Sequence, residues 1–70
     1  DQAGEYLMMS LRLAEGMDID RYASLAGAGL NAAAVSRLDE LGIVTLAHGK
    51  LAATMQGRPV LNAIIRELMP

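Results

Sequence analysis

Glycines divide this chain of 70 residues into short segments, and the spacing of apolar residues changes from one segment to the next. Gly16, Gly27 and Gly42 each follow a stretch of helical period, where a glycine commonly ends a helix. Asp18 and Asn31 stand where N-cap residues belong. The pattern predicts three short helices, over residues 5–14, 19–26 and 32–41.

The chain after Gly42 changes to a period of two. Residues 43–47 and 50–53 flank the pair His48-Gly49, which suits a tight turn because Gly and His tolerate positive φ. We therefore expect a β-hairpin. Thr54 is the expected N-cap of a last helix that runs to about Met69, with Pro59 near its start. The predicted fold is mainly α with a small β-hairpin (α+β), and its order of three helices, hairpin and helix is winged-helix-like.

The apolar content is high for so short a chain: 53% of the residues are hydrophobic, although Phe and Trp are absent. Ala, Leu, Ile, Val and Met must fill the core, and we expect Met9, Met55 and Met69 to fill irregular gaps in it. The expected inward faces are Tyr6, Leu7, Met9, Leu11 and Leu13; Ile19, Tyr22 and Leu25 or Ala26; Ala34, Val35, Leu38 and Leu41; and Val60, Leu61, Ile64, Ile65 and Leu68.

Part of this apolar surface is expected to meet a partner, because small domains rarely expose so much of it. Met8 projects among the polar positions of the first predicted helix, on the side of Arg12. Met8 and Arg12 are therefore the candidate residues for a contact outside the domain.

Three features of the sequence bear on where the protein is located and whether it is a piece of a longer one. No apolar run reaches the length of a membrane span, and no basic segment followed by an apolar one gives the pattern of a signal peptide. The absence of cysteine fits a reducing compartment, so we expect a cytoplasmic protein. The chain begins with Asp1 rather than Met, from which we expect a piece of a longer protein.

No constellation for catalysis is evident. Ser10 and Ser36 fall on the expected outer faces of helices, and neither lies in a nucleophile-elbow motif. Asp18 and Asp20 fit a helix N-terminus better than a metal site, because no calcium-loop spacing follows. His48 fits an exposed turn better than a metal or haem ligand. We expect neither a catalytic centre nor a cofactor or metal site in this chain.

A winged-helix order raises the alternative of a DNA-binding module of a transcriptional regulator. The third predicted helix would read the bases, but its outer face sets Arg37 against Asp39 and Glu40. The hairpin adds only Lys50 and His48, and the net charge is −2. We therefore expect no nucleic-acid partner. A plain dimerisation domain is a third hypothesis.

Six short pieces of sequence occur in a familiar order. They are Tyr6-Leu-Met-Met-Ser-Leu-Arg-Leu, Glu15-Gly-Met-Asp, Leu38-x-x-Leu-Gly-Ile-Val, residues 51–54, Gln56-Gly-Arg and Leu61-Asn. In this order and spacing they resemble the C-terminal domain of oxygen-independent coproporphyrinogen III oxidase-like proteins (HemN/HemW-type), over residues 5–68. That family belongs to the radical S-adenosylmethionine superfamily and includes haem chaperones.

The resemblance implies that the chemistry lies outside residues 1–70. In the family, an upstream barrel holds a four-iron, four-sulfur cluster on a Cys-x3-Cys-x2-Cys motif and binds S-adenosylmethionine. The C-terminal domain packs beside the barrel and helps to cover its open side. Residues 1–70 are then one accessory domain of a parent that oxidises coproporphyrinogen or transfers haem. Met8 and Arg12 of the first helix would face the barrel.

Overall fold

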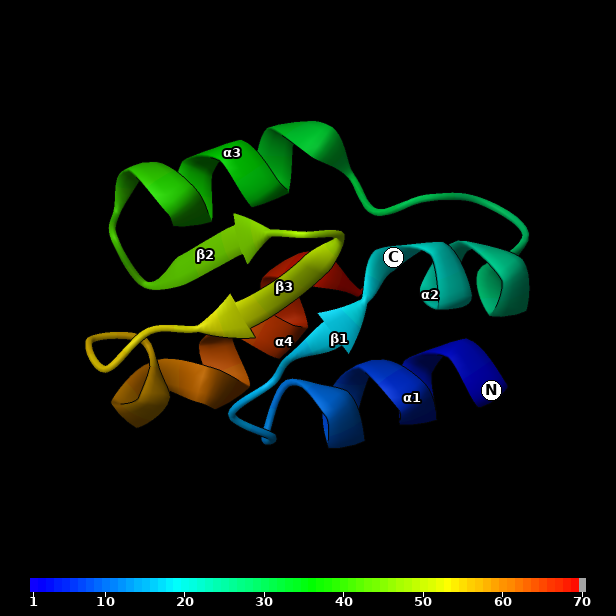
Figure 1. Cartoon of the computed structure of the whole chain (residues 1–70), viewed down its shortest axis with the longest axis horizontal. Coiled ribbons are helices and arrows are strands. Elements are labelled where there is room, and N and C mark those ends of the chain that lie inside the picture. Colours follow the sequence, from blue (N-terminus) through cyan, green and yellow to red (C-terminus); the bar gives the residue numbers. More distant parts are fainter. Residues whose placement is uncertain (70) are drawn as a thin grey trace.

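Four helices surround a small antiparallel sheet in the computed structural model, which describes residues 1–69 (Figure 1). The sheet has the strand order β1-β3-β2. The elements are α1 (Gln2–Ser10), β1 (Met17–Asp18), α2 (Ile19–Ala26), α3 (Ala32–Glu40), β2 (Val44–Ala47), β3 (Lys50–Ala53), the 3-10 helix η1 (Arg58–Val60) and α4 (Leu61–Leu68). The predicted class is confirmed: the fold is α+β, with three helices, a hairpin and a C-terminal helix in winged-helix-like order.

The short strand β1 was not predicted from the sequence. Met17 pairs with Leu51, and Asp18 pairs with Lys50. Gly16 makes this approach possible because its φ is +82° and a Cβ there would collide with the carbonyl oxygen of Leu51. Only glycine therefore suits position 16, where it leads the chain into the sheet rather than ending a helix.

The first helix lies earlier in the chain than predicted. The Asp1 carboxylate accepts a hydrogen bond from the amide of Ala3 and caps α1, which ends at Ser10 rather than at residue 14. Tighter i→i−3 bonds follow, such as Arg12 N–H to the Met9 carbonyl. The chain must leave the helix here to bring Met17, which is fully buried, to β3.

The second and third helices lie where the sequence predicted them. Asp18 accepts hydrogen bonds from the amides of Asp20 and Arg21, and Asn31 accepts one from Ala34, so both predicted N-caps are confirmed. The hairpin is confirmed too, with β2 and β3 in register around His48 (φ 54°) and Gly49 (φ 75°). These two positive φ values match the twist that a two-residue hairpin needs.

The last helix is shorter than predicted. Thr54 does not cap α4; its hydroxyl donates to the Gly42 carbonyl at 2.7 Å and accepts from the Gly57 amide. Pro59 falls inside η1, and α4 begins at Leu61. Proline has no N–H for an α-helical ladder, so the preceding segment winds as a 3-10 turn instead.

The core draws one or more side chains from every α-helix and every strand. It comprises Ala3, Leu7, Leu11, Met17, Tyr22, Ala34, Leu38, Val44, Leu51, Ala53, Ile64, Ile65 and Leu68. Several predictions of burial are wrong. The side chains that were predicted to face inward but are exposed are those of Met9, Leu13, Leu25, Ala26, Leu41, Met55, Val60 and Met69. Ser10, predicted to face outward, is buried. Met17 is the methionine that fills the core.

Candidate interaction surfaces

The first candidate surface lies at the C-terminal end of α1. It comprises Met8, Met9, Arg12 and Leu13, and we call it the α1 face. The three apolar side chains are 38%, 71% and 51% exposed, respectively, and Arg12 is exposed beside them. The opposite side of α1 buries Leu7 against the core.

The α1 face is larger than sequence analysis predicted. Met8 and Arg12 are exposed as expected, and Met9 and Leu13 are exposed beside them. Met9 lies within α1 on the side away from the buried Leu7, whereas Leu13 lies past the end of α1, where the chain turns toward β1. The predicted inward arc was too wide at Met9, and at Leu13 the helical period was extended past Ser10, where α1 ends. The glycine at position 16 was the signal that the chain changes direction soon after the helix.

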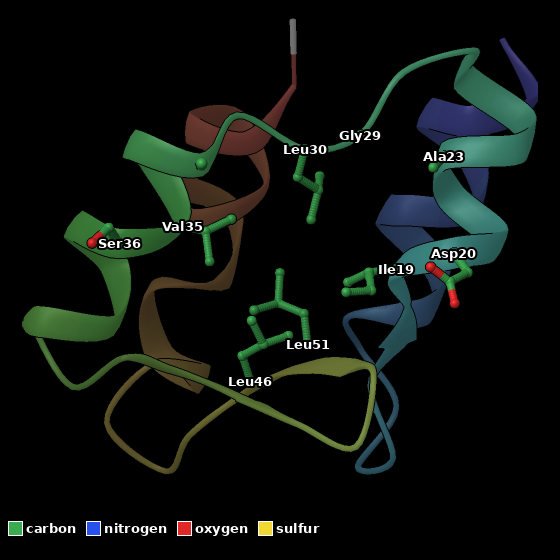
Figure 2. A pocket seen from close by; sticks show the side chains of 10 residues that line it. Ile19, Asp20, Ala23, Gly29, Leu30, Val35, Ser36, Leu46 and Leu51 are labelled. Carbon is green, nitrogen blue, oxygen red and sulfur yellow. The ribbon is translucent and has the colours of Figure 1, made fainter.

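The second candidate surface is a hollow of about 440 Å³ between α2 and α3, which we call the α2–α3 groove. Figure 2 shows Ile19, Leu30, Val35, Leu46 and Leu51 directed into the space between the two helices. The complete lining is Ile19, Asp20, Ala23, Gly29, Leu30, Ala32, Val35, Ser36, Leu46 and Leu51. Sequence analysis did not predict this groove.

Small residues keep the groove open. Ala23 on α2, Gly29 in the connection and Ala32 on α3 line it where larger side chains would fill the space. Residues 27–31 connect the two helices, and Gly29 and Leu30 of this connection line the groove. Leu46 of β2, at the base, remains 49% exposed as a result.

The outer face of α3 is the surface that a DNA-binding winged helix would use. Its one basic residue, Arg37, donates to the carboxylate of Glu67 on α4 at 2.6 Å, with both side chains about half exposed. Asp39 and Glu40 are exposed nearby on the same helix. The guanidinium is thus engaged within the domain, and the free charges of this face are negative.

The remaining candidate residues have ordinary structural positions. Asp18 caps α2, His48 is an exposed turn residue, Ser36 is exposed and Ser10 is buried. Within residues 1–69, no group of three or more His, Asp or Glu side chains lies close enough to hold a metal ion. None of the helices described is long and apolar enough to cross a membrane.

The fold and these surfaces define a small α+β domain with two candidate interaction surfaces. Residues 1–60 match the family model of the HemN C-terminal domain. The chain therefore belongs to the HemN C-terminal domain family, as its sequence motifs indicated, and is a member of the coproporphyrinogen oxidase-like family. Comparisons with curated proteins and with solved structures found no match.

Proposed function

We propose that this chain is the accessory domain of a larger, cytoplasmic radical S-adenosylmethionine protein in haem metabolism. It packs beside the catalytic barrel through the α1 face and helps to cover the barrel's open side. The parent either decarboxylates coproporphyrinogen oxidatively or transfers haem. Membership in the HemN C-terminal domain family supports this proposal, and the exposed apolar α1 face is the observation that supports an interdomain contact.

The α1 face has the chemistry of a protein interface. Large apolar side chains with an arginine beside them are typical of the buried centre and rim of such contacts. Complete burial of a Met or Leu side chain contributes about 1.5–3 kcal/mol, so covering the exposed parts of Met8, Met9 and Leu13 would supply a few kcal/mol. Arg12 would add a charge-assisted hydrogen bond to a carboxylate or carbonyl of the barrel.

We place the cofactors of the proposed parent outside these residues. Iron–sulfur clusters are held by cysteine thiolates, and this chain contains no cysteine. The cysteine ligands of the four-iron, four-sulfur cluster must therefore come from outside residues 1–70, and the family resemblance implies that S-adenosylmethionine binds there too. The role proposed for this domain is to bind the barrel and to cover its open side, while the rest of the parent holds the porphyrin or haem.

The coding region upstream of Asp1 provides the first test. We expect an in-frame α/β stretch of barrel size with a Cys-x3-Cys-x2-Cys motif. A coding region that starts close to Asp1, or that encodes a ligand-sensing domain without those cysteines, would contradict the proposal and favour the regulator hypothesis.

Substitutions on the α1 face test the contact itself. In the full-length parent, Met8→Glu and Arg12→Glu should increase hydrogen exchange at the barrel surface that α1 covers, because each places a carboxylate in the contact. Met55→Glu is the matched control, since Met55 is 86% exposed and lies far along the chain after β3. Equal exchange in all three variants and the unmodified parent would remove α1 from the interface.

A further inference from the structure

The α2–α3 groove is a second surface, independent of the α1 face. None of its ten lining residues comes from α1; they come from α2, the connection to α3, α3 itself and the hairpin. The α1 face and the groove are thus separate surfaces, and a partner on one does not have to contact the other.

The dimensions of the groove fit the side of a helix. Its walls are helices of eight and nine residues, which at 1.5 Å per residue are about 12–13 Å long. That length corresponds to a little over two turns of an occupant lying along them. The groove is open along one side (Figure 2), and its base is formed by Leu46 and Leu51. An amphipathic helix laid into an apolar groove is a common mode of recognition.

The charge of the lining selects among such helices. Asp20 is the one charged residue that lines the groove, and its side chain is exposed. Within residues 1–69 the ion pair between Arg37 and Glu67 is the only one, so the Asp20 carboxylate has no cationic partner in this part of the chain. A basic side chain at the edge of an otherwise apolar helix face would complement it.

We propose that the α2–α3 groove binds an amphipathic helix with an apolar face and a basic residue at its edge, supplied by the rest of a longer HemN-like protein. The source of the helix rests on the proposed function above. The chemistry of the occupant rests on the lining of the groove alone. The two parts are tested separately.

A pair of model peptides tests the chemistry. Each has about 12 residues, is held helical by a lactam bridge and carries a Leu/Ala face; one has a lysine at the edge of that face and the other a glutamate. Titration of the 70-residue chain, followed by amide NMR shifts, should show shifts at Ala23, Val35 and Leu46. The lysine peptide should bind about fivefold more tightly at low salt, as expected for one exposed charge contact.

Two adjacent alanines provide a matched pair of variants. Ala32 lines the groove and Ala33, its exposed neighbour on α3, does not. Ala32→Phe should weaken peptide binding about tenfold or more by occupying the groove, whereas Ala33→Phe should change it less than about twofold. Absence of shifts at the groove, equal affinity for both peptides or equal effects of the two variants would each overturn the proposal.

A second copy of the chain is the competing occupant. Sedimentation of the chain without peptide should show a monomer at the concentrations used for titration. A dimer that Ala32→Phe dissociates and Ala33→Phe does not would assign the groove to self-association and overturn the proposal.

The source of the helix is tested in the full-length parent. Ala23→Cys places a thiol in the groove, and Ser24→Cys places one at an exposed position that does not line it. Peptide-resolved mass spectrometry should show that a maleimide labels Ser24→Cys equally in the parent and the 70-residue chain, but labels Ala23→Cys much more slowly in the parent. Equal labelling of Ala23→Cys in both would overturn an internal helix, whereas the α1 variants report on the proposed function independently.

Discussion

The two sides of α3 differ in how the domain closes them. On the side of α4, Leu38 and Ile64 belong to the buried core, and Arg37 bridges to Glu67 across a hollow of about 290 Å³. On the side of α2, Val35 is half-buried, and the larger α2–α3 groove has no bridge across it. We call these the closed side and the open side of α3.

The difference shows that the sizes of the facing side chains, rather than amphipathicity alone, decide which helices pack. The closed side brings branched and long side chains from both helices together. The open side faces small residues, Ala23 and Gly29, which cannot reach across to α3. A helix with apolar residues on two sides can therefore bury one side within the domain and leave the other exposed to a partner.

Truncation of side chains should give the largest difference in stability between the closed side and the open side. Ile64→Ala should lower the free energy of unfolding by about 2–5 kcal/mol, because it leaves a cavity in the core. Leu46→Ala should cost less than about 1 kcal/mol, because this side chain is already half exposed at the base of the groove. Urea denaturation followed by circular dichroism measures both. If Ile64→Ala is unfolded in buffer, Ile64→Val, expected to cost about 0.5–1.5 kcal/mol, replaces it. Similar costs on both sides would mean that the open side is as well packed as the closed one.

Enlarging alanines should have the next largest effect. Ala34 is buried in the core, so Ala34→Leu should cost about 1–3 kcal/mol through overpacking. Ala23→Leu enters the groove, where there is room, and should change stability by less than about 0.5 kcal/mol. Thermal unfolding of the two variants tests the difference. A large loss from Ala23→Leu would show that the groove closes in solution.

The ion pair on the closed side should contribute little. A double-mutant cycle with Arg37→Ala and Glu67→Ala should give a coupling of about 0.2–1 kcal/mol, because both side chains are about half exposed to water. The coupling should fall as salt is added. A coupling that exceeds this range and resists salt would identify the pair as a principal clamp between α3 and α4.

The outer face of α3 is expected not to bind DNA. Fluorescence titration of the chain with duplex DNA at low salt is expected to detect no binding, because Arg37 is paired and Asp39 and Glu40 would be repelled by phosphates. Weak binding that disappears with salt and is lost in Arg37→Ala would revive the regulator hypothesis.

Local signals were the reliable part of the sequence. Asp18 and Asn31 cap α2 and α3 as predicted, and His48-Gly49 forms the hairpin turn. These features depend on side chains that bond to their own nearby backbone or on φ values that few residues adopt. Met8 and Arg12 were predicted to be exposed for a similar reason, since their position on the helix is set by local periodicity.

Long-range pairing explains the errors. Periodicity assigned Leu13 to the core, but β1 pairs with β3, which draws the chain out of the helix and leaves this side chain exposed. Met9 lies within α1, and it is exposed because the core packs against the other side of that helix. Thr54 was predicted to cap the last helix, yet its hydroxyl bonds to the carbonyl of Gly42, twelve residues earlier in the chain. The sequence next to β1 does not reveal its pairing with β3, and the sequence next to Thr54 does not reveal its bond to Gly42.

By itself, the sequence determined the class of the fold, the order of its main elements and the family to which the chain belongs, because these follow from caps, turns, periodicity and motif order. Only the tertiary structure decided which apolar residues remain exposed. That outcome depends on the third strand, on the close approach of Gly16 to Leu51 and on the small residues that leave the space between α2 and α3 unfilled. Burial is a property of pairs of elements, and the partner of each element is chosen by contacts distant in sequence.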